Sequence, residues 1–333
     1  LMNKYIFFRT DRIGDFLVSS ILFKAIKRND PNSHITIIAS EKNYEYIKTL
    51  SFVDKVINYP SNILNKLKFF LSIRNNKYYL IGALDGKKRS IYFSLLLKSK
   101  FKFLITTKKI YKKIFKNVFT SIIYSLDAEN KIDEIKYFLN KINFNLNTND
   151  FNIFDKEVLN TDISDFNCLK KKNFILFHFD EKWIFNSYIK EYTKIEPSIN
   201  ELFNFLKSMI KKTNKNIVVT TGVSTSKIIT DLKKNLNKIT ENLHELTHEN
   251  KKIFLVIEPT FFSLKYLINK SELLITCHGA PSHVASSLNR YFIDIFEGRL
   301  KSFYFRWNSH FKNCHNLHRE DFSVLSKNII KLL

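Results

Sequence analysis

The sequence is short of several residue types, and each shortage excludes a class of protein. Its 333 residues include three cysteines, none in a Cys-x-x-Cys pair, which argues against a disulfide framework or a zinc site. No uncharged apolar run reaches the ~18 residues of a membrane span, and no leader-like pattern precedes the first apolar run. The signatures GxGxxG, GxxxxGK[ST], GxSxG and Asp-x-Asp do not occur. We expect a cytoplasmic protein with no resident metal or cofactor.

Carboxylates are scarce relative to basic residues. The chain has 31 Asp and Glu against 54 Lys and Arg, a formal net charge of +23. Such a field attracts polyanions, whether nucleic acid, anionic lipid headgroups or phosphorylated small molecules. Lysine that merely solvates helix faces would give the same excess, so the charge alone does not select a partner.

What the sequence does contain is a regular alternation of strand-like and helix-like segments. Apolar strands are expected at 5–8, 34–39, 55–58, 78–84 and 101–105, and again at 174–179, 216–220, 253–257, 273–276 and 291–296. Helix-length segments between them predict βαβ units and parallel sheets. Asn- and Asp-rich residues 143–172 read as a linker. We predict an α/β fold of two doubly wound domains, 1–155 and 156–333, facing each other across a ligand cleft.

Glycine is rare enough to be informative. Only six occur, and five directly follow a predicted strand: Gly14, Gly86, Gly222, Gly279 and Gly298. Each alone is explained as an ordinary strand-to-helix turn. As a set they outline the two faces of a cleft, where the backbone approaches a ligand closely.

The turn after the first strand, Arg9-Thr-Asp-Arg-Ile-Gly-Asp15, holds the first candidate chemistry. Asp15 stands at the start of a helix, whose dipole favours an ionised carboxylate. It is a candidate general base, and helix capping is the alternative. Asp11 is expected to shape the turn, while Arg9 and Arg12 hold the turn or meet substrate charge.

Two loops in the second half can bind an anion. Lys182, after the strand at 174–179, is a point charge for phosphate or the surface partner of Glu181. Residues 276–283, Thr-Cys-His-Gly-Ala-Pro-Ser-His, join a strand to a small-residue helix whose N-terminus can face an anion. Their histidines lack enough accompanying ligands for a metal site, and Cys277 has no evident base partner.

Residues 108–123 suggest a basic amphipathic helix. Apolar pairs recur at 110/111, 114/115, 118/119 and 122/123, flanked by five lysines. Such a helix can lie on an anionic membrane or pack its stripe on the sheet; the pattern leaves both open.

Taken in order, these segments resemble glycosyltransferase family 9, the ADP-heptose:lipopolysaccharide heptosyltransferases. In the first half, the family's successive motifs are resembled by residues 9–15, 31–38, 52–57 and 84–90. In the second half, its Asp-Ser/Thr-Gly-Pro-x-His donor signature is resembled by residues 264–268, 271–276, 278–283 and 285–288. Lys182-Trp183 looks like a shortened Lys-x-Trp. His278, Gly279 and Ala280 depart from the signature, which lacks its usual carboxylate here.

The resemblance implies a GT-B fold and inverting, metal-independent transfer of a sugar, expected to be heptose from ADP-heptose, onto a lipopolysaccharide or lipooligosaccharide core at the inner-membrane face. It places the base at Asp15. The donor set is Lys182, Gly222, Glu258, His278, Gly279, Ala280, Pro281, Ser282 and His283. The acceptor set is Arg9, Asp11, Arg12, Gly14, Lys87, Lys88 and Arg89, which would bind an anionic lipid-linked oligosaccharide.

Two alternatives remain open at this point. One is a family 9 enzyme that uses a different nucleotide sugar, as the altered turn at 278–280 allows. The other is a non-catalytic protein of the same fold that binds polyanions through its positive charge. No nucleic-acid-binding motif occurs, and the aromatic residues fall in core-like patterns, so we expect no nucleic-acid partner.

Overall fold

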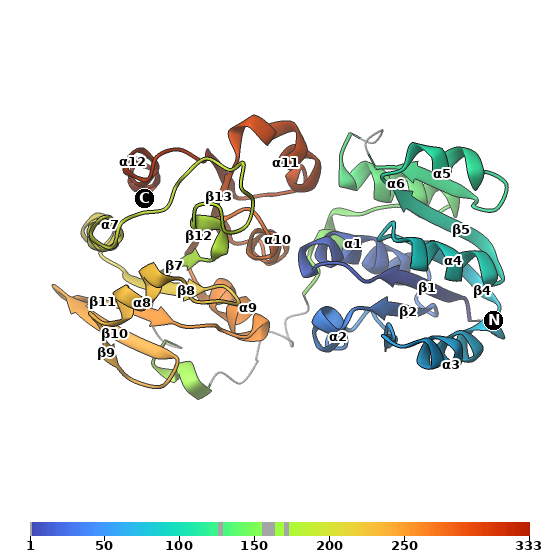
Figure 1. Cartoon of the computed structure of the whole chain (residues 1–333), viewed down its shortest axis with the longest axis horizontal. Helices are drawn as coiled ribbons and strands as arrows, with labels where there is room; N and C mark the ends of the chain where they lie inside the picture. The colour runs from blue at the N-terminus through green and yellow to red at the C-terminus, as the bar shows by residue number, and fades with distance from the viewer. Residues whose placement is uncertain (1, 126–128, 155–163, 170–172) are drawn as a thin grey trace. The chain divides into compact units, whose positions relative to one another are not determined.

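The computed structural model describes residues 2–125, 129–154, 164–169 and 173–333, and these form two compact units (Figure 1). Unit 1 comprises Leu1–Val158 with Phe305–His310, and unit 2 comprises Leu159–Tyr304 with Phe311–Leu333. Part of the predicted linker, residues 155–163 and 170–172, lies outside the described residues. The start of that linker packs against unit 1. Asp150 is buried and pairs with Arg28 at 2.9 Å, so residues near 150 pack on the first helix.

Unit 1 is a parallel six-stranded sheet in the order β3-β2-β1-β4-β5-β6. Its strands are β1 (Lys4–Arg9), β2 (His34–Ala39), β3 (Lys55–Asn58), β4 (Tyr78–Ala83), β5 (Ser99–Thr106) and β6 (Ser121–Tyr124). Its helices are α1 (Ile13–Asn29), α2 (Glu41–Ile47), α3 (Ile63–Arg74), α4 (Lys88–Leu96), α5 (Lys109–Ile114) and α6 (Lys131–Lys141), with the 3₁₀ turn η1 (Thr148–Phe151).

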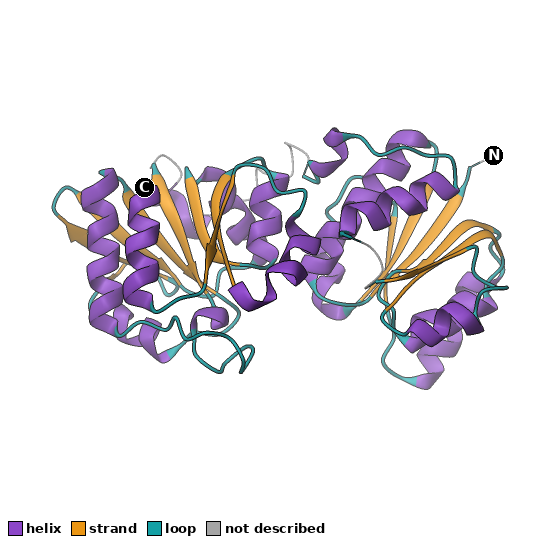
Figure 2. Ribbon diagram, turned by 90° about the horizontal axis from the view of Figure 1, so that it is seen from above, coloured by secondary structure: helices purple, strands orange, loops and turns teal. Residues whose placement is uncertain are grey.

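Side-chain alternation along the strands sorts these helices into two layers, because successive residues point to opposite faces. On one face, Phe7 packs on Phe23 of α1 at 4.7 Å and Phe103 stacks on Phe138 of α6 at 4.6 Å. On the other, α3 and α4 cover the residues that alternate with these. Figure 2 shows helices on both sides of the strands.

The single helix expected over residues 108–123 is wrong. Helix α5 ends at Ile114, and Ser121–Tyr124 forms β6, which pairs with β5. The apolar pairs recur every four residues through both segments, so their spacing does not reveal the change from helix to strand. The β-branched residues from Val118 to Ile123 favour an extended chain, and Ile123 is buried in the sheet.

Unit 2 is an eight-stranded sheet in the order β14-β13-β12-β7-β8-β11-β10-β9. Its strands are β7 (Phe174–Phe179), β8 (Asn216–Thr221), β9 (Asn237–Lys238), β10 (Leu243–His248), β11 (Lys251–Val256), β12 (Leu273–Cys277), β13 (Tyr291–Phe296) and β14 (Cys314–His318). Six strands are parallel, while β10 and β9 add an antiparallel edge.

The helices of unit 2 are α7 (Ile199–Thr213), α8 (Lys227–Lys233), α9 (Phe261–Lys270), α10 (Ala280–Ser287), α11 (Lys301–Asn308) and α12 (Phe322–Leu332). The 3₁₀ turns are η3 (Ser164–Leu169), η4 (Glu181–Trp183) and η5 (Gly298–Leu300). Helix α7 shows how the sequence sets such boundaries. Ser198 and Glu201 form a reciprocal capping box at its start, and Asn214 ends it in the left-handed region. Helix α11 crosses the division, so its last four residues belong to unit 1.

No helix among residues 2–125, 129–154, 164–169 and 173–333 has the length and apolar character needed to cross a membrane.

Candidate functional site

Asp15 lies in the first turn of α1 and is half-buried. Its backbone carbonyl accepts hydrogen bonds from Nη2 of Arg9 at 2.8 Å and Oγ of Ser19 at 3.2 Å. Its carboxylate makes no hydrogen bond or ion pair with the residues that the structure describes. The N-cap position belongs to Arg12, without a side-chain cap hydrogen bond. Asp15 is therefore not the capping residue, and its carboxylate stays available at the positive end of the helix dipole.

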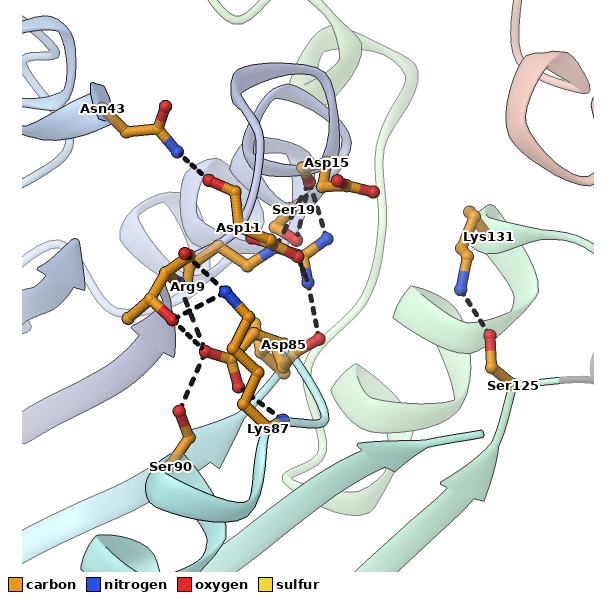
Figure 3. Close-up of polar contacts among 12 residues, drawn as sticks. Arg9, Asp11, Asp15, Ser19, Asn43, Asp85, Lys87, Ser90, Ser125 and Lys131 are labelled. Carbon is orange, nitrogen blue, oxygen red and sulfur yellow. Dashed lines mark hydrogen bonds and ion pairs between the residues drawn. The ribbon is translucent and has the colours of Figure 1, made fainter. Parts of the chain in front are cut away.

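The buried side chain of Arg9 stabilises this turn. It is buried, and its guanidinium donates to the carbonyls of Asp15 and Leu84 and pairs with Asp11 at 2.9 Å (Figure 3). Of the two roles open to Arg9, holding the turn is the one that the structure shows. Its donors are directed at the backbone that carries Asp15.

The basic residues after β4 divide into two kinds. Nζ of Lys87 donates to the carbonyl of Thr10 at 2.7 Å, and Nη2 of Arg89 donates to Oγ1 of Thr10 at 2.7 Å. Lys88 is exposed. Asp85, which sequence reasoning did not select, accepts from Oγ1 of Thr10 at 2.7 Å. Lys87 and Arg89 thus connect the turn after β1 to the segment that follows β4.

The pKa of Asp11 is unusually high for a carboxyl group. Burial raises its pKa to about 6, and the nearby charges of Asp15 and Asp85 act in the same direction against the lowering effect of Arg9. Asn43 donates to the backbone carbonyl of Asp11 at 2.6 Å. The ion pair with Arg9 and the bond from Asn43 tie Asp11 into the turn, at the cost of burying a carboxylate.

Asp15 opens onto a cavity of about 210 Å³ within unit 1. Arg9, Asp11 and Asp85 form part of its lining, with Ser125, Lys131, Glu134 and Trp307 on α6, α11 and the end of β6. Lys87, Lys88 and Arg89 are outside this lining among the described residues. The predicted acceptor set is therefore split between the cavity and the surface beside it.

Lys131 and Glu134 form a buried ion pair in the cavity wall, with Nζ 2.7 Å from Oε2. The Trp307 ring covers the ammonium at 4.8 Å, and Oγ of Ser125 accepts a hydrogen bond from it at 2.8 Å. Burial lowers the pKa of Lys131, although Glu134 opposes this. Sequence reasoning missed these residues. The available signal was a Lys and a Glu three residues apart in the sequence, and Trp307 offered none.

The predicted donor residues gather at the carboxyl ends of four neighbouring strands of unit 2. Lys182 follows β7, Gly222 follows β8, Glu258 follows β11, and residues 278–283 follow β12. Glu258 accepts from Oγ1 of Thr225 at 2.9 Å. This edge of a doubly wound sheet is where such folds bind ligands.

Lys182 is largely buried, with 13% of its side chain exposed, and forms an ion pair with Asp180, not the surface pair with Glu181 that was the alternative. Burial on its own would lower the pKa of Lys182, but the charge of Asp180 and its hydrogen bond outweigh this and raise the pKa above its ordinary value. The same pairing lowers the pKa of Asp180 against the effect of burial. A Cβ atom on Gly279 would lie 2.9 Å from Nζ of Lys182. The ammonium therefore sits against the turn that begins α10.

A buried carboxylate organises that turn. Asp294 on β13 is fully buried and contacts Nδ1 of His278 at 2.7 Å and Oγ of Ser282 at 2.7 Å. His283 is buried beside them, its ring 5.5 Å from that of His278. Sequence reasoning missed Asp294, which stands inside an apolar strand. The carboxylate that is lacking at position 278 is thus present one strand away.

Two other chemistries considered for this turn are constrained by the structure. Burial raises the pKa of Cys277 to about 12, so its thiol is protonated at neutral pH and is a poor nucleophile. No group of three or more potential metal-binding side chains occurs among the residues that the structure describes.

Comparison with solved structures identifies the architecture. A glycosyl transferase family 9 protein from Veillonella parvula matches 99% of this chain and 90% of its own, with a TM-score of 0.67 at 13% identity. The E. coli heptosyltransferase WaaC with ADP-2-deoxy-2-fluoro heptose matches 99% and 100%, with a TM-score of 0.66 at 10% identity. The chain has the GT-B fold.

Other enzymes share this GT-B fold. A UDP-GlcNAc 2-epimerase from Methanocaldococcus jannaschii covers 100% of this chain and 92% of its own, with a TM-score of 0.53 at 13% identity. No protein-family model matches the sequence, and no curated protein matches it significantly. Within this GT-B fold, the Asp15 set belongs to unit 1 and the Lys182 set to unit 2.

Proposed function

We propose that this protein is an inverting glycosyltransferase that uses a nucleotide-sugar donor. The observation that carries the proposal is the carboxylate of Asp15, presented to a cavity at the start of α1 by a backbone that Arg9 holds in place. The structural likeness to a family 9 protein and to WaaC bound to an ADP-heptose analogue supports a sugar-transfer reaction over the other uses of the fold.

The reaction is a single displacement at the anomeric carbon. An acceptor hydroxyl in the cavity attacks that carbon while its proton passes to Asp15. The bond from the anomeric carbon to the diphosphate oxygen breaks, and the nucleoside diphosphate leaves with its electron pair. The ammonium of Lys182 and the N-terminus of α10 stabilise the charge that develops on the leaving group. Attack from the face opposite the leaving group inverts the configuration.

The donor proposed here is ADP-heptose and the acceptor an anionic lipopolysaccharide or lipooligosaccharide core, encountered at the cytoplasmic face of the inner membrane. We propose that Lys88, which is exposed, and Arg12 and Gly14 of the first turn meet acidic groups of the acceptor. A different nucleotide sugar remains the alternative, because His278 and Asp294 replace the usual carboxylate geometry at the donor turn.

Calorimetry tests this proposal against polyanion binding. The full chain is titrated with ADP-, GDP- and UDP-sugars and, separately, with a single-stranded oligonucleotide. Heat from one nucleotide sugar that Lys182→Met abolishes supports the donor site. Tight, salt-sensitive oligonucleotide binding with no response to any nucleotide sugar would refute the enzyme and favour the polyanion-binding alternative.

A further inference from the structure

Most of the protein's net positive charge comes from one continuous segment of unit 1. Residues 55–125 contain sixteen Lys and Arg and one carboxylate, Asp85, and so account for +15 of the net +23. The segment runs from β3 through β6 and includes α3, α4 and α5. Asp85 is turned inward to Thr10 and Ser90. The surface that this segment presents to solvent is therefore almost purely basic.

The three helices of this segment cover one face of the sheet. Phe69 and Ile73 of α3 pack with Phe8 and Ile81 of β1 and β4, and Phe93 of α4 joins them. Ile91 of α4 packs with Ala83 and Leu104, and Tyr111 and Phe115 of α5 pack against that cluster. Ile81 and Ala83 alternate to the same face of β4. The apolar side chains on the inner sides of α3, α4 and α5 thus pack against this face of the sheet.

Each helix has a second apolar stripe on its outer side. Ile63, Leu64, Leu67 and Leu71 of α3 are 82%, 74%, 56% and 45% exposed. The outer stripes of α4 and of α5 with its following turn are also exposed: Tyr92, Leu96, Ile110, Ile114 and Val118. A single exposed leucine needs no explanation, but three neighbouring helices with the same double-sided pattern do.

The chemistry of this face selects its occupant. Exposed lysines on and around the helices, including Lys68, Lys112 and Lys116, surround the apolar side chains. A soluble polyanion would pair with the lysines but leave the leucines in water. A second copy of the chain would bring two positive faces together. An anionic bilayer offers phosphate at its surface and hydrocarbon just beneath it, which matches both components.

We propose that the outer face of α3, α4 and α5 binds an anionic phospholipid bilayer, with the α3 leucines inserted among the headgroups and the lysines at the phosphates. Membrane contact was one of two alternatives left open for residues 108–123; the surface proposed here spans three helices and is centred on α3. The inference rests on unit 1 alone and does not depend on the proposed sugar transfer.

Vesicle co-sedimentation of the full chain tests the proposal. Wild type is expected to bind vesicles containing phosphatidylglycerol and to bind pure phosphatidylcholine vesicles at least tenfold more weakly. Leu64→Ser/Leu67→Ser should weaken binding to the anionic vesicles about tenfold or more. Its matched control, Val324→Ser/Leu332→Ser, changes two exposed apolar residues of α12 and should bind as wild type does. All four positions are exposed, and circular dichroism checks that each variant is folded.

The charge arm uses Lys112→Glu/Lys113→Glu on α5 against Lys211→Glu/Lys212→Glu on α7, all exposed. Only the α5 pair should reduce binding, by at least fivefold. Equal binding to neutral vesicles, or an undiminished affinity of the leucine variant, would overturn the proposal. So would a dimer in sedimentation velocity that Leu64→Ser/Leu67→Ser dissolves, because the face would then bind a second copy. None of these measurements involves turnover, so failure here is distinct from failure of the proposed reaction.

Discussion

Replacing Asp11 by asparagine is expected to stabilise unit 1 at neutral and alkaline pH. Burial, with the charges of Asp15 and Asp85, raises the pKa of Asp11 from 3.8 to about 6 despite the opposing charge of Arg9. Folding with this carboxyl ionised therefore costs free energy. A difference of about two pKa units corresponds to about 3 kcal/mol. Asparagine removes the charge and keeps an oxygen that can accept from Arg9.

The sign of the pH dependence follows from the raised pKa. The contribution of Asp11 to stability is fully present below pH 3.8, where it is protonated in both states, and is lost as pH rises through 6. The advantage of Asp11→Asn over wild type should thus be near zero at pH 4, grow between pH 4 and about 6.5, and level off near 3 kcal/mol by pH 8.

The two tryptophans make the measurement specific to one unit. Trp183 lies in unit 2 and Trp307 in unit 1, so urea unfolding in a Trp183→Phe background reports on unit 1 through Trp307. Glu45→Gln is the control, because its exposed carboxylate pairs with Lys48 at 3.5 Å and such pairs contribute little. If Asp11→Asn is less stable than wild type at pH 8, the pair with Arg9 outweighs desolvation and the reasoning is wrong.

Three further predictions concern the site. Asp15→Asn should lower turnover by about 10²–10⁴-fold with little change in melting temperature, because Asp15 bonds through its backbone carbonyl; wild-type turnover would exclude it as the base. Gly279→Ala should weaken nucleotide-sugar binding in calorimetry while leaving the urea midpoint nearly unchanged, since its Cβ displaces the mobile end of Lys182; unchanged affinity would mean that this ammonium does not meet the donor. Glu134→Gln should destabilise unit 1 by about 3–5 kcal/mol, because it leaves Lys131 buried without its counter-charge; a loss below 1 kcal/mol in urea unfolding would show that the fold does not depend on this ion pair.

The sequence predicts well the strands that are buried on both faces of a sheet. Strand β7 is a continuous buried apolar run, and its predicted bounds, 174–179, are confirmed. Strand β14, Cys-His-Asn-Leu-His, lies at the sheet edge and is largely exposed, so no hydrophobic pattern marks it. Strand β10 was missed for another reason. Its turn to β11 places Glu249 at φ 53°, where a hairpin normally signals itself with Asn-Gly or Asp-Gly.

The candidate site divides in the same way. The positions of Asp15 and Lys182 could be predicted because each directly follows a buried strand of a parallel sheet. Their partners could not. Asp294 reaches His278 from the neighbouring strand, and Trp307 reaches Lys131 across 176 residues of sequence. Such contacts form only through tertiary packing, and the local spacing of residue types in the sequence does not predict them.

The return of residues 305–310 to unit 1 limits how this protein can be taken apart or recombined. A fragment ending at residue 154 would contain Asp15, Lys131 and Glu134 but lack the Trp307 indole that covers Lys131 and lines the cavity. An exchange of N-terminal halves between two such proteins would pair each pocket with a foreign aromatic wall. The unit that must be exchanged is therefore the first half of the chain together with residues 305–310. Substrate preference should be transferred only when both are exchanged.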